Sequence, residues 1–588
     1  MIDALLCAFL GLTVLSPPPA PGKDSPARSQ PLHALFDEAW DFELREDPLF
    51  ATSVGDHRFD DRLPSVGVSD QARRAEARRK FLERLRAIDP SGLDETERES
   101  HALQRIKLED AIREFELHHY RFPINADSGF HMELGQLPSQ MPFDTTHDYE
   151  NYVARLHGFP EYFRQNVALL REGLEKGWTL PKAALAGYEK TIEAHVVTDP
   201  AKSRFFTPFT AFPAGVPEAD RARLTAAGEK AIRDDVVPAY RSFLEFMTRD
   251  YVPGARASVG AGELPGNGRE YYAYLVHHFT TVDSTPDEIH ALGLQEVGRI
   301  RGEMDEVIRK TGFSGSFADF LKFLRTDPRF YAKTPEELLK QASWIAKRID
   351  GKLPSLFGRL PRQPYGVEPV PAEIAPKYTG GRYVAAPPRG KKAGTYWVNT
   401  YALESRPLYV LTSLTLHEAV PGHHLQGALS AELTDLPAFR RFLYVDAFGE
   451  GWGLYSERLG LEMGLYTDPY SNFGRLTYEM WRACRLVVDT GLHAKGWTRQ
   501  QAIDYLAGNT ALSLHECTTE TDRYISWPGQ ALAYKMGELE LRKLRRRAEE
   551  ALGARFDVRD FHDRILAGGT VTLPILEARI DSWIRSKR

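Results

Sequence analysis

Apolar residues recur at three- and four-residue spacing along much of the chain, which is the period of amphipathic helices. Residues 69–117 carry this pattern twice, with a break at Asp89-Pro90-Ser91-Gly92, and residues 150–175 and 223–250 repeat it. A pattern of this kind, repeated over long stretches, predicts a mainly α-helical fold built from many helices.

Three helix starts are marked by threonines in capping position. Thr285 and Thr334 each precede a proline and then two acidic residues, and Thr498 precedes Arg499-Gln500-Gln501. A threonine hydroxyl can accept from the free N–H groups of a first turn, proline fits the first helical position, and acids there favour the helix dipole. We therefore expect helices to begin directly after each threonine.

One stretch departs from the helical pattern. Residues 361–400 contain seven prolines, and two short β-prone runs lie among them, at 381–384 and 395–399. Runs this close together can pair as a small hairpin or ribbon. The stretch also suggests a division into an N-terminal helical half, residues 31–370, and a catalytic helical half, residues 371–588. We expect the halves to pack as one unit, because no flexible linker separates them.

The strongest chemical signal follows the β-prone runs. A largely apolar run, 408–416, leads into the sequence His417-Glu418-Ala419-Val420-Pro421-Gly422-His423-His424. Zinc peptidases commonly place two histidines four residues apart on a helix, so that both reach one ion. Here the fourth position after His417 is Pro421. In a regular helix the side chains at positions six and seven could not share a metal with His417.

The Pro421-Gly422 pair changes this expectation. Proline removes a helical hydrogen bond and clashes with the carbonyl four residues earlier, and glycine adopts unusual backbone angles. We expect a bulge here that brings His423 towards the ion held by His417. The alternative is that the pair ends one helix and that His423 and His424 cap the next.

A catalytic zinc site needs a third protein ligand and an open position for water. Glu450 is the best candidate, because it follows His423 by 27 residues and leaves room for a loop and a returning helix. Glu457 lies seven residues further on the same predicted face and suits a partner that orients a ligand histidine. With Zn²⁺ as cofactor, Glu418 would act as general base and proton shuttle.

Composition and charge add little to this picture. The chain has 588 residues, 42% of them hydrophobic and 27% charged, with a net charge of −6. These values are ordinary for a folded protein and give no reason to propose nucleic acid or an anionic membrane as partner. The three cysteines form no CxxC pair, so a cysteine-based zinc site and a disulfide framework are both disfavoured.

The N-terminus has features of an export signal. Residues 1–30 contain an apolar run, 4–15, followed by a proline-rich linker. The run is short for a membrane span and suits the apolar core of a signal peptide, although no basic residue precedes it. We expect an exported protein, periplasmic or lipid-anchored, with no transmembrane span in the mature chain.

Three segments together resemble a known family: HEAVPGHHLQ at 417–426, EGWGLYSE at 450–457 and RYISWPGQALAYKMGE at 523–538. They are similar to the bacterial family named domain of unknown function 885, and the likeness covers most of residues 31–588. That family resembles helical zinc carboxypeptidases and dipeptidases of the HExxH class. The resemblance implies a large metallopeptidase-like fold, often exported, with His423 rather than His424 as ligand and His424 in a supporting place.

The third segment supplies further candidates. Its likeness places it near the cleft, where Tyr524 could donate to an oxyanion and Arg523 could bind a substrate carboxylate. The alternative is a core role for Tyr524 and a structural ion pair for Arg523. Gln530, Tyr534 and Lys535 are weaker candidates for substrate contact.

The β-prone run before the motif offers a different kind of contact. Tyr396 and Asn399 could bind an extended peptide by strand addition, and the alternative is a packed hairpin.

These observations favour a zinc metallopeptidase, carboxypeptidase- or dipeptidase-like, that hydrolyses short peptides. Two other functions stay open: a zinc hydrolase of a non-peptide amide or ester, and a non-catalytic helical peptide-binding protein. Retention of Glu418 disfavours the binding protein, because catalysis needs that residue and simple metal binding does not.

Overall fold

Helices dominate the computed structural model, which describes residues 29–126, 128–372, 374–385 and 393–588. The helices before residue 260 are α1 (Gln30–Glu46), α2 (Pro48–Ser53), α3 (Val68–Arg86), α4 (Glu95–Glu116), α5 (Phe130–Leu134), α6 (Leu137–Gln140), α7 (Thr146–His157), α8 (Phe159–Lys176), α9 (Glu189–Glu193), α10 (Glu218–Ala231), α11 (Val237–Phe246) and α12 (Val252–Gly254). The later helices are α13 (Gly268–Thr280), α14 (Pro286–Thr311), α15 (Phe317–Thr326), α16 (Pro335–Asp350), α17 (Leu411–Glu418), α18 (His423–Ala431), α19 (Ala438–Phe442), α20 (Asp446–Glu462), α21 (Pro469–Ala494), α22 (Arg499–Asn509), α23 (Leu514–Ser526), α24 (Ala533–Leu552), α25 (Val558–Leu566) and α26 (Leu573–Lys587). The prediction of a mainly α-helical fold is confirmed.

The predicted helix starts are confirmed with their chemistry. The side chains of Thr285, Thr334 and Thr498 each accept from the backbone N–H three residues on, at the starts of α14, α16 and α22. The stretch 69–117 forms α3 and α4, with a short 3-10 turn over the predicted break. Local capping signals therefore fixed these boundaries.

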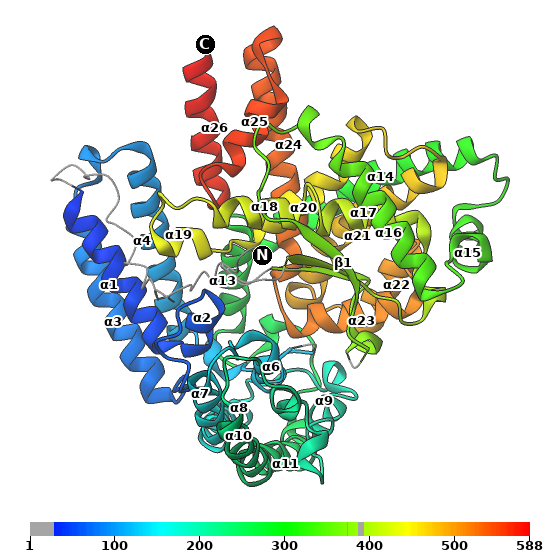
Figure 1. The fold of residues 1–588 in the computed structure, drawn as a ribbon. Helices are drawn as coiled ribbons and strands as arrows, with labels where there is room; N and C mark the ends of the chain where they lie inside the picture. The colour runs from blue at the N-terminus through cyan, green and yellow to red at the C-terminus, as the bar shows by residue number, and fades with distance from the viewer. Residues whose placement is uncertain (1–28, 127, 373, 386–392) are drawn as a thin grey trace, which may run out of the picture.

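The helices gather around several hydrophobic cores (Figure 1). Residues 124–251 have a core of their own, in the lower lobe that contains α6 to α11. Helices α1, α3 and α4 share another core with α18, α20 and the C-terminal helices α24 to α26. A third core lies between α14 to α17 and α21 to α23.

Two of these cores join residues from both sides of the predicted boundary at 370/371. Helix α14 also packs along α21, which belongs to the predicted catalytic half. Burial of shared apolar surface on this scale holds the two parts of the chain together.

The small sheet has three strands, β1 (Tyr365–Pro369), β2 (Gly381–Val384) and β3 (Gly394–Val398), in the order β1-β3-β2. Antiparallel pairing of β2 with β3 confirms the predicted ribbon. The parallel pairing of β1 with β3 was not predicted. Among the described residues, no strand pairs with the outer edge of β2, and this edge meets the end of α17.

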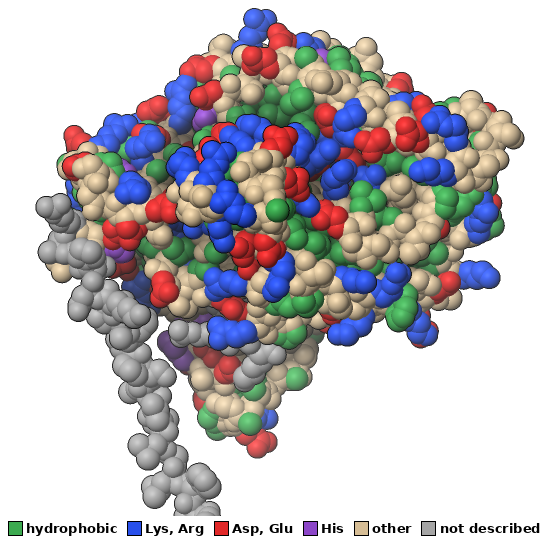
Figure 2. Space-filling model, turned by 90° about the horizontal axis from the view of Figure 1, so that it is seen from above, with side chains coloured by type: hydrophobic (Ala, Val, Ile, Leu, Met, Phe, Trp, Pro, Cys, Tyr) green, Lys and Arg blue, Asp and Glu red, His purple; other side chains and the backbone are tan. Residues whose placement is uncertain are grey.

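The predicted leader, residues 1–30, lies almost entirely outside the described residues. Within the described ranges, no helix is both long enough and apolar enough to cross a membrane. Cys484 and Cys517 are buried free thiols. Basic and acidic side chains are intermingled over the face seen in Figure 2, as expected for solvated helix faces.

Asp489 connects three elements at the centre of the molecule. This fully buried carboxyl on α21 accepts from the Tyr272 hydroxyl of α13 at 2.7 Å and from the Gly529 N–H at 3.1 Å. Burial raises the pKa of Asp489 to about 7, against an ordinary value of 3.8, and the two donors only partly oppose this. The folded protein therefore keeps a proton here that the unfolded chain releases in mild acid.

The stability contribution of Asp489 should therefore fall as pH rises from about 4 to about 7. The difference between the ordinary pKa and the raised pKa of Asp489 corresponds to a change of at most ~4 kcal/mol in the free energy of unfolding. Asp489→Asn removes the titration, so urea unfolding at several pH values should show the variant gaining stability relative to the parent as pH rises. If the free energies of unfolding of the two proteins changed with pH in the same way, the raised pKa of Asp489 would be contradicted.

Candidate metal centre

Helix α17 carries the first histidine of the motif into the interior. His417 is 2% exposed, and every residue of α17 before Glu418 is buried. The helix ends at Glu418, and α18 begins at His423, so the backbone breaks over Ala419 to Gly422. The predicted interruption at Pro421-Gly422 is confirmed, and it takes the form of two helices joined by a tight turn.

Gly422 is essential to that turn. Its N–H donates to the Leu416 carbonyl at 3.0 Å, and a Cβ built on it would lie 1.8 Å from the His417 carbonyl oxygen. Only glycine fits so close to the backbone. The tight turn brings the imidazole rings of His417 and His423 to a centroid separation of 4.8 Å.

The two imidazoles converge on Glu450 of α20. Nε2 of His417 lies 3.4 Å from the Glu450 Oε2, and Nε2 of His423 lies 3.3 Å from the same oxygen. These three ligand-type atoms all lie within 4.8 Å of one another. Burial opposes the Glu450 charge, but His423 and His417 outweigh it and hold the pKa of Glu450 well below its usual range.

A cation fits this arrangement. The Glu450 Oε2 is buried and has no hydrogen-bond partner, which is costly for a carboxylate oxygen unless a positive charge compensates. Two imidazole nitrogens and one carboxylate oxygen form a donor set that suits a zinc site with one open position.

Glu457 orients the first imidazole. The Nδ1 of His417 lies 2.9 Å from the Glu457 Oε1, and Arg482 pairs with the same oxygen at 3.3 Å. This bond leaves Nε2 of His417 turned towards Glu450. Gly453, between the two glutamates on α20, makes room for the ring, since a Cβ there would lie 2.7 Å from it.

The choice between the paired histidines is resolved by their contacts. His423 belongs to the convergent group, whereas His424 points elsewhere. Nδ1 of His424 lies 3.2 Å from the Tyr383 hydroxyl, and Nε2 lies 3.0 Å from the Gln363 carbonyl oxygen. His424 thus supports strand β2 rather than a ligand residue.

Glu418 lies at the free edge of β2. Its Oε2 accepts from the Tyr383 backbone N–H at 2.8 Å, and its side chain remains partly accessible. Burial of the His417 ring lowers its pKa, but the bonds to Glu450 and Glu457 outweigh burial. The negative charge of Glu418 adds to their effect, and the pKa of His417 is raised to about 9. The carboxylate is therefore held beside the convergent group.

Two tyrosines lie beside the convergent group. The Tyr534 ring stacks against His417 with a centroid distance of 6.3 Å. The Tyr444 hydroxyl donates to the Glu450 Oε1 at 3.3 Å, and 53% of Tyr444 is exposed. Burial nevertheless raises the pKa of Tyr444 well above its usual range, with Glu450 adding to the effect.

Tyr524, in contrast with Tyr534 and Tyr444, does not contact the convergent group. Tyr524 is fully buried, and its hydroxyl accepts from Trp481 Nε1 and Arg485 Nε at 2.8 Å each. These contacts place Tyr524 in the core, as the alternative interpretation of the sequence had it. The predicted role as oxyanion donor does not fit Tyr524, because its neighbours already occupy the hydroxyl.

The other candidates of that segment are also engaged within the protein. Lys535 is fully buried and pairs with Glu538 at 3.0 Å, inside a network of charged side chains. Arg523 donates to Glu520 at 3.0 Å and to Gln530 at 2.7 Å, which leaves neither side chain free. Predicted substrate contacts by Arg523, Gln530 and Lys535 are therefore not supported.

The two candidates on the ribbon serve the sheet itself. Tyr396 is fully buried in β3, and the Asn399 side-chain amide donates to the carbonyls of Ala375, Tyr378 and Thr379. Strand addition at β3 is ruled out by its central position, because its backbone groups pair with β1 and β2. The free edge for a peptide belongs to β2.

A second group of ligand-type side chains consists of Asp110 and Glu114 on α4 and His278 on α13. The His278 Nδ1 lies 2.9 Å from an Asp110 oxygen, and the Tyr274 hydroxyl donates to Asp110 at 2.8 Å. Burial disfavours a charged His278, but Asp110 outweighs it and raises its pKa to about 9. In the described structure, this group is held together by the ion pair between His278 and Asp110.

Sequence reasoning missed Tyr444 and Asp446, which flank the ligand helix. Burial raises the pKa of Asp446 to about 6, and the neighbouring Glu450 adds to it. Asp446 precedes Glu450 by four residues, so the helical period would have placed both on one face. Tyr444 lies before the helix and carries no such signal.

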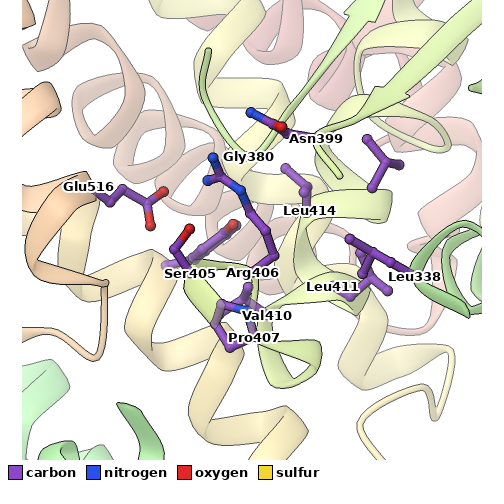
Figure 3. Close-up of a pocket in the computed structure, with 12 residues that line it drawn as sticks. Leu338, Gly380, Asn399, Ser405, Arg406, Pro407, Val410, Leu411, Leu414 and Glu516 are labelled. Carbon is purple, nitrogen blue, oxygen red and sulfur yellow. The ribbon is translucent and has the colours of Figure 1, made fainter. Parts of the chain in front are cut away.

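A separate pocket lies beside α17 (Figure 3). Arg406 stands between Glu516 on one side and the leucines Leu338, Leu411 and Leu414 on the other. Burial raises the pKa of Glu516 to about 7, and Arg406 opposes this. None of the three convergent residues lines this pocket, so it is not the place where the ligand atoms meet.

Comparison with known proteins gave one matching family model and several solved structures. The model of a family described as "Bacterial protein of unknown function (DUF885)" matches residues 48–580. A structure from Colwellia psychrerythraea is 28% identical, with a TM-score of 0.89, and the likeness covers 95% of this chain and 100% of that one. A structure from Shewanella oneidensis is 18% identical, with a TM-score of 0.69, covering 94% and 99%. Both are described as a "putative lipoprotein". No curated protein matches the chain.

Proposed function

The chain belongs to the bacterial DUF885 family, whose function is unknown, and we propose that this member is a zinc-dependent metallopeptidase that hydrolyses short peptides. One observation carries the proposal. His417, His423 and Glu450 direct three ligand-type atoms at one point, and the shared carboxylate oxygen there has no other partner. Glu418 stands next to this group and is not one of its members.

The donor set supports zinc in particular. Two histidine nitrogens and one carboxylate oxygen match catalytic zinc sites, which keep a fourth position for water or substrate. When bound there, zinc would lower the pKa of a water molecule towards neutrality and polarise a substrate carbonyl. Glu457 would fix the orientation of His417 by accepting from its Nδ1.

The protein residues would divide the remaining work. Glu418 would take a proton from the attacking water and pass it to the leaving amine, and the Tyr383 N–H would keep its carboxylate in place. The Tyr534 hydroxyl would donate to the oxyanion that develops on the scissile carbonyl. Burial and Glu450 raise the pKa of Tyr534, so its hydroxyl stays protonated at neutral pH.

The edge of β2 supports an extended peptide as substrate. Because the Tyr383 N–H donates to Glu418, an added strand would use the other outward backbone groups of β2 and would run past the ligand residues.

Export is a second part of the proposal. The solved structures that resemble this chain are described as lipoproteins, and residues 1–30 have the pattern of a signal peptide and linker. We therefore place the peptidase in the periplasm or at a lipid anchor, where short peptides would reach it.

A direct test combines metal loading with a peptide digest. The full chain should bind close to one zinc, and the zinc-loaded protein should cleave a mixed pool of short peptides, read by mass spectrometry. A chelator should stop cleavage, and added zinc should restore it. Failure of the zinc-loaded protein to cleave any peptide would reject the proposal, and cleavage of ester or non-peptide amide substrates alone would favour a different hydrolase.

A further inference from the structure

Arg382 lies on the free edge strand, one residue before the contact that holds the general base. Side chains alternate along a strand, so Arg382 leaves the face of β2 opposite to Tyr383. The Tyr383 ring contacts His424, and Arg382 lies opposite Trp397 of β3 in the register. The side chain of Arg382 is thus not part of the contacts between the sheet and α18.

The guanidinium is exposed yet surrounded by groups of the candidate metal centre. The Arg382 residue is exposed to solvent. Burial opposes its charge, but Tyr378, Glu418 and Tyr534 outweigh this and raise the pKa of Arg382. The same charge acts on the pKa of Tyr444. Glu418 bonds to the next residue along β2 and Tyr534 stacks against His417, so the charge of Arg382 lies close to the convergent group.

In the described ranges, Arg382 forms an ion pair with no carboxylate within 4.0 Å, in contrast with other arginines near the site. Arg482 pairs with Glu457, Arg485 with Glu520, and Arg523 with Glu520. An enclosed cation usually has an anionic partner, because removing the charge from water is costly. The Arg382 side chain hydrogen-bonds Tyr378, which is neutral, so its charge remains available to an anionic ligand.

We propose that Arg382 binds the C-terminal carboxylate of the peptide substrate. A guanidinium matches a carboxylate with two parallel hydrogen bonds, a geometry that lysine does not reproduce. The inference rests on the proposed function and deepens it. A carboxylate held this close to Glu418 restricts cleavage to bonds near the C-terminus of short peptides, which makes the enzyme an exopeptidase.

The test uses a pool of mixed tripeptides prepared once with free C-termini and once with C-terminal amides. The zinc-loaded full chain should cleave the free-acid pool about 10- to 100-fold faster in kcat/KM, the range for a hydrogen-bonded charged contact. In Arg382→Met, hydrolysis of free acids should fall by that factor, hydrolysis of amides should not change, and the preference should vanish. Arg382→Lys should restore only part of the preference.

Arg362 supplies the matched control. It is an arginine whose side chain is 85% exposed and pairs with Glu432 on the outer surface, so Arg362→Met should keep the full preference. A purely structural role for Arg382 would slow both pools equally, and that result would overturn the inference. Absence of any preference in the parent protein would overturn it as well.

Failure of the proposed function would be recognised separately. If the zinc-loaded parent cleaves neither pool, equilibrium binding of the two pools to the Glu418→Gln protein decides the matter. Tighter binding of free acids that disappears with Arg382→Met would support the carboxylate site without hydrolysis. Equal binding of both pools, or binding of neither, would overturn it.

Discussion

Replacing Glu418 with glutamine is expected to lower kcat for peptide hydrolysis by about 10²- to 10⁴-fold while zinc stays bound. That range is the usual contribution of a positioned general base. Glutamine has nearly the same shape and still offers an oxygen to the Tyr383 N–H, which donates to Glu418 at 2.8 Å. Glutamine cannot accept the proton of the attacking water, so the hydrolytic step should slow while zinc binding is retained. Steady-state kinetics and metal analysis on the same preparation measure both quantities.

A matched control is Glu432→Gln, which alters an acid that pairs with Arg362 at the surface. Its kcat and zinc content should equal those of the parent. Near-normal activity of Glu418→Gln would show that another group acts as base. Loss of zinc in Glu418→Gln would instead mean that Glu418 helps to hold the metal.

His423→Ala is expected to lower zinc affinity by at least ~100-fold, whereas His424→Ala should leave it nearly unchanged. Of these two adjacent histidines, His423 directs a nitrogen at Glu450, at 3.3 Å from Oε2, and His424 does not. Removal of a residue that hydrogen-bonds a metal ligand lowers metal affinity by about 10- to 100-fold, and removal of the metal ligand itself should lower it further. His424 bonds to Tyr383 and Gln363 and should affect the stability of the sheet instead.

Zinc competition with a chelating dye measures these affinities directly. Thermal unfolding provides a second readout, because a ligand that binds the folded state raises the melting temperature. Zinc should raise the melting temperature of the parent and of His424→Ala but not that of His423→Ala. Equal zinc binding by the two alanine variants would refute the assignment of His423.

Much of the fold could be predicted because the relevant signals are local. The capping threonines act within three residues of themselves, so sequence spacing alone located the starts of α14, α16 and α22. Strand β1 was missed for the opposite reason. It pairs with β3 in parallel across almost thirty residues and ends at Pro369, and neither its length nor its composition marks it.

The candidate site divides in the same way. His417, Glu450 and Glu457 were identified because a helix converts spacing into shared orientation. The residues that failed, Tyr524 and Lys535, lie in a segment that does approach the candidate site. Whether a polar side chain faces the site or an internal partner depends on neighbours far away in sequence, such as Arg485 for Tyr524 and Glu479 for Lys535.

The glycines of α20 have a consequence for how relatives of this chain are recognised. Gly453 lies against the His417 ring, and Gly451 approaches Gly537 of α24 so closely that a Cβ would lie 2.5 Å from its Cα. The run from Glu450 to Glu457 is therefore constrained by shape as well as by its two carboxylates. A descendant that had lost Glu418 would still have to keep these glycines to fold. A match to the family through this run therefore reports a packing arrangement as well as two carboxylates, and the test of activity rests on Glu418 beside His417.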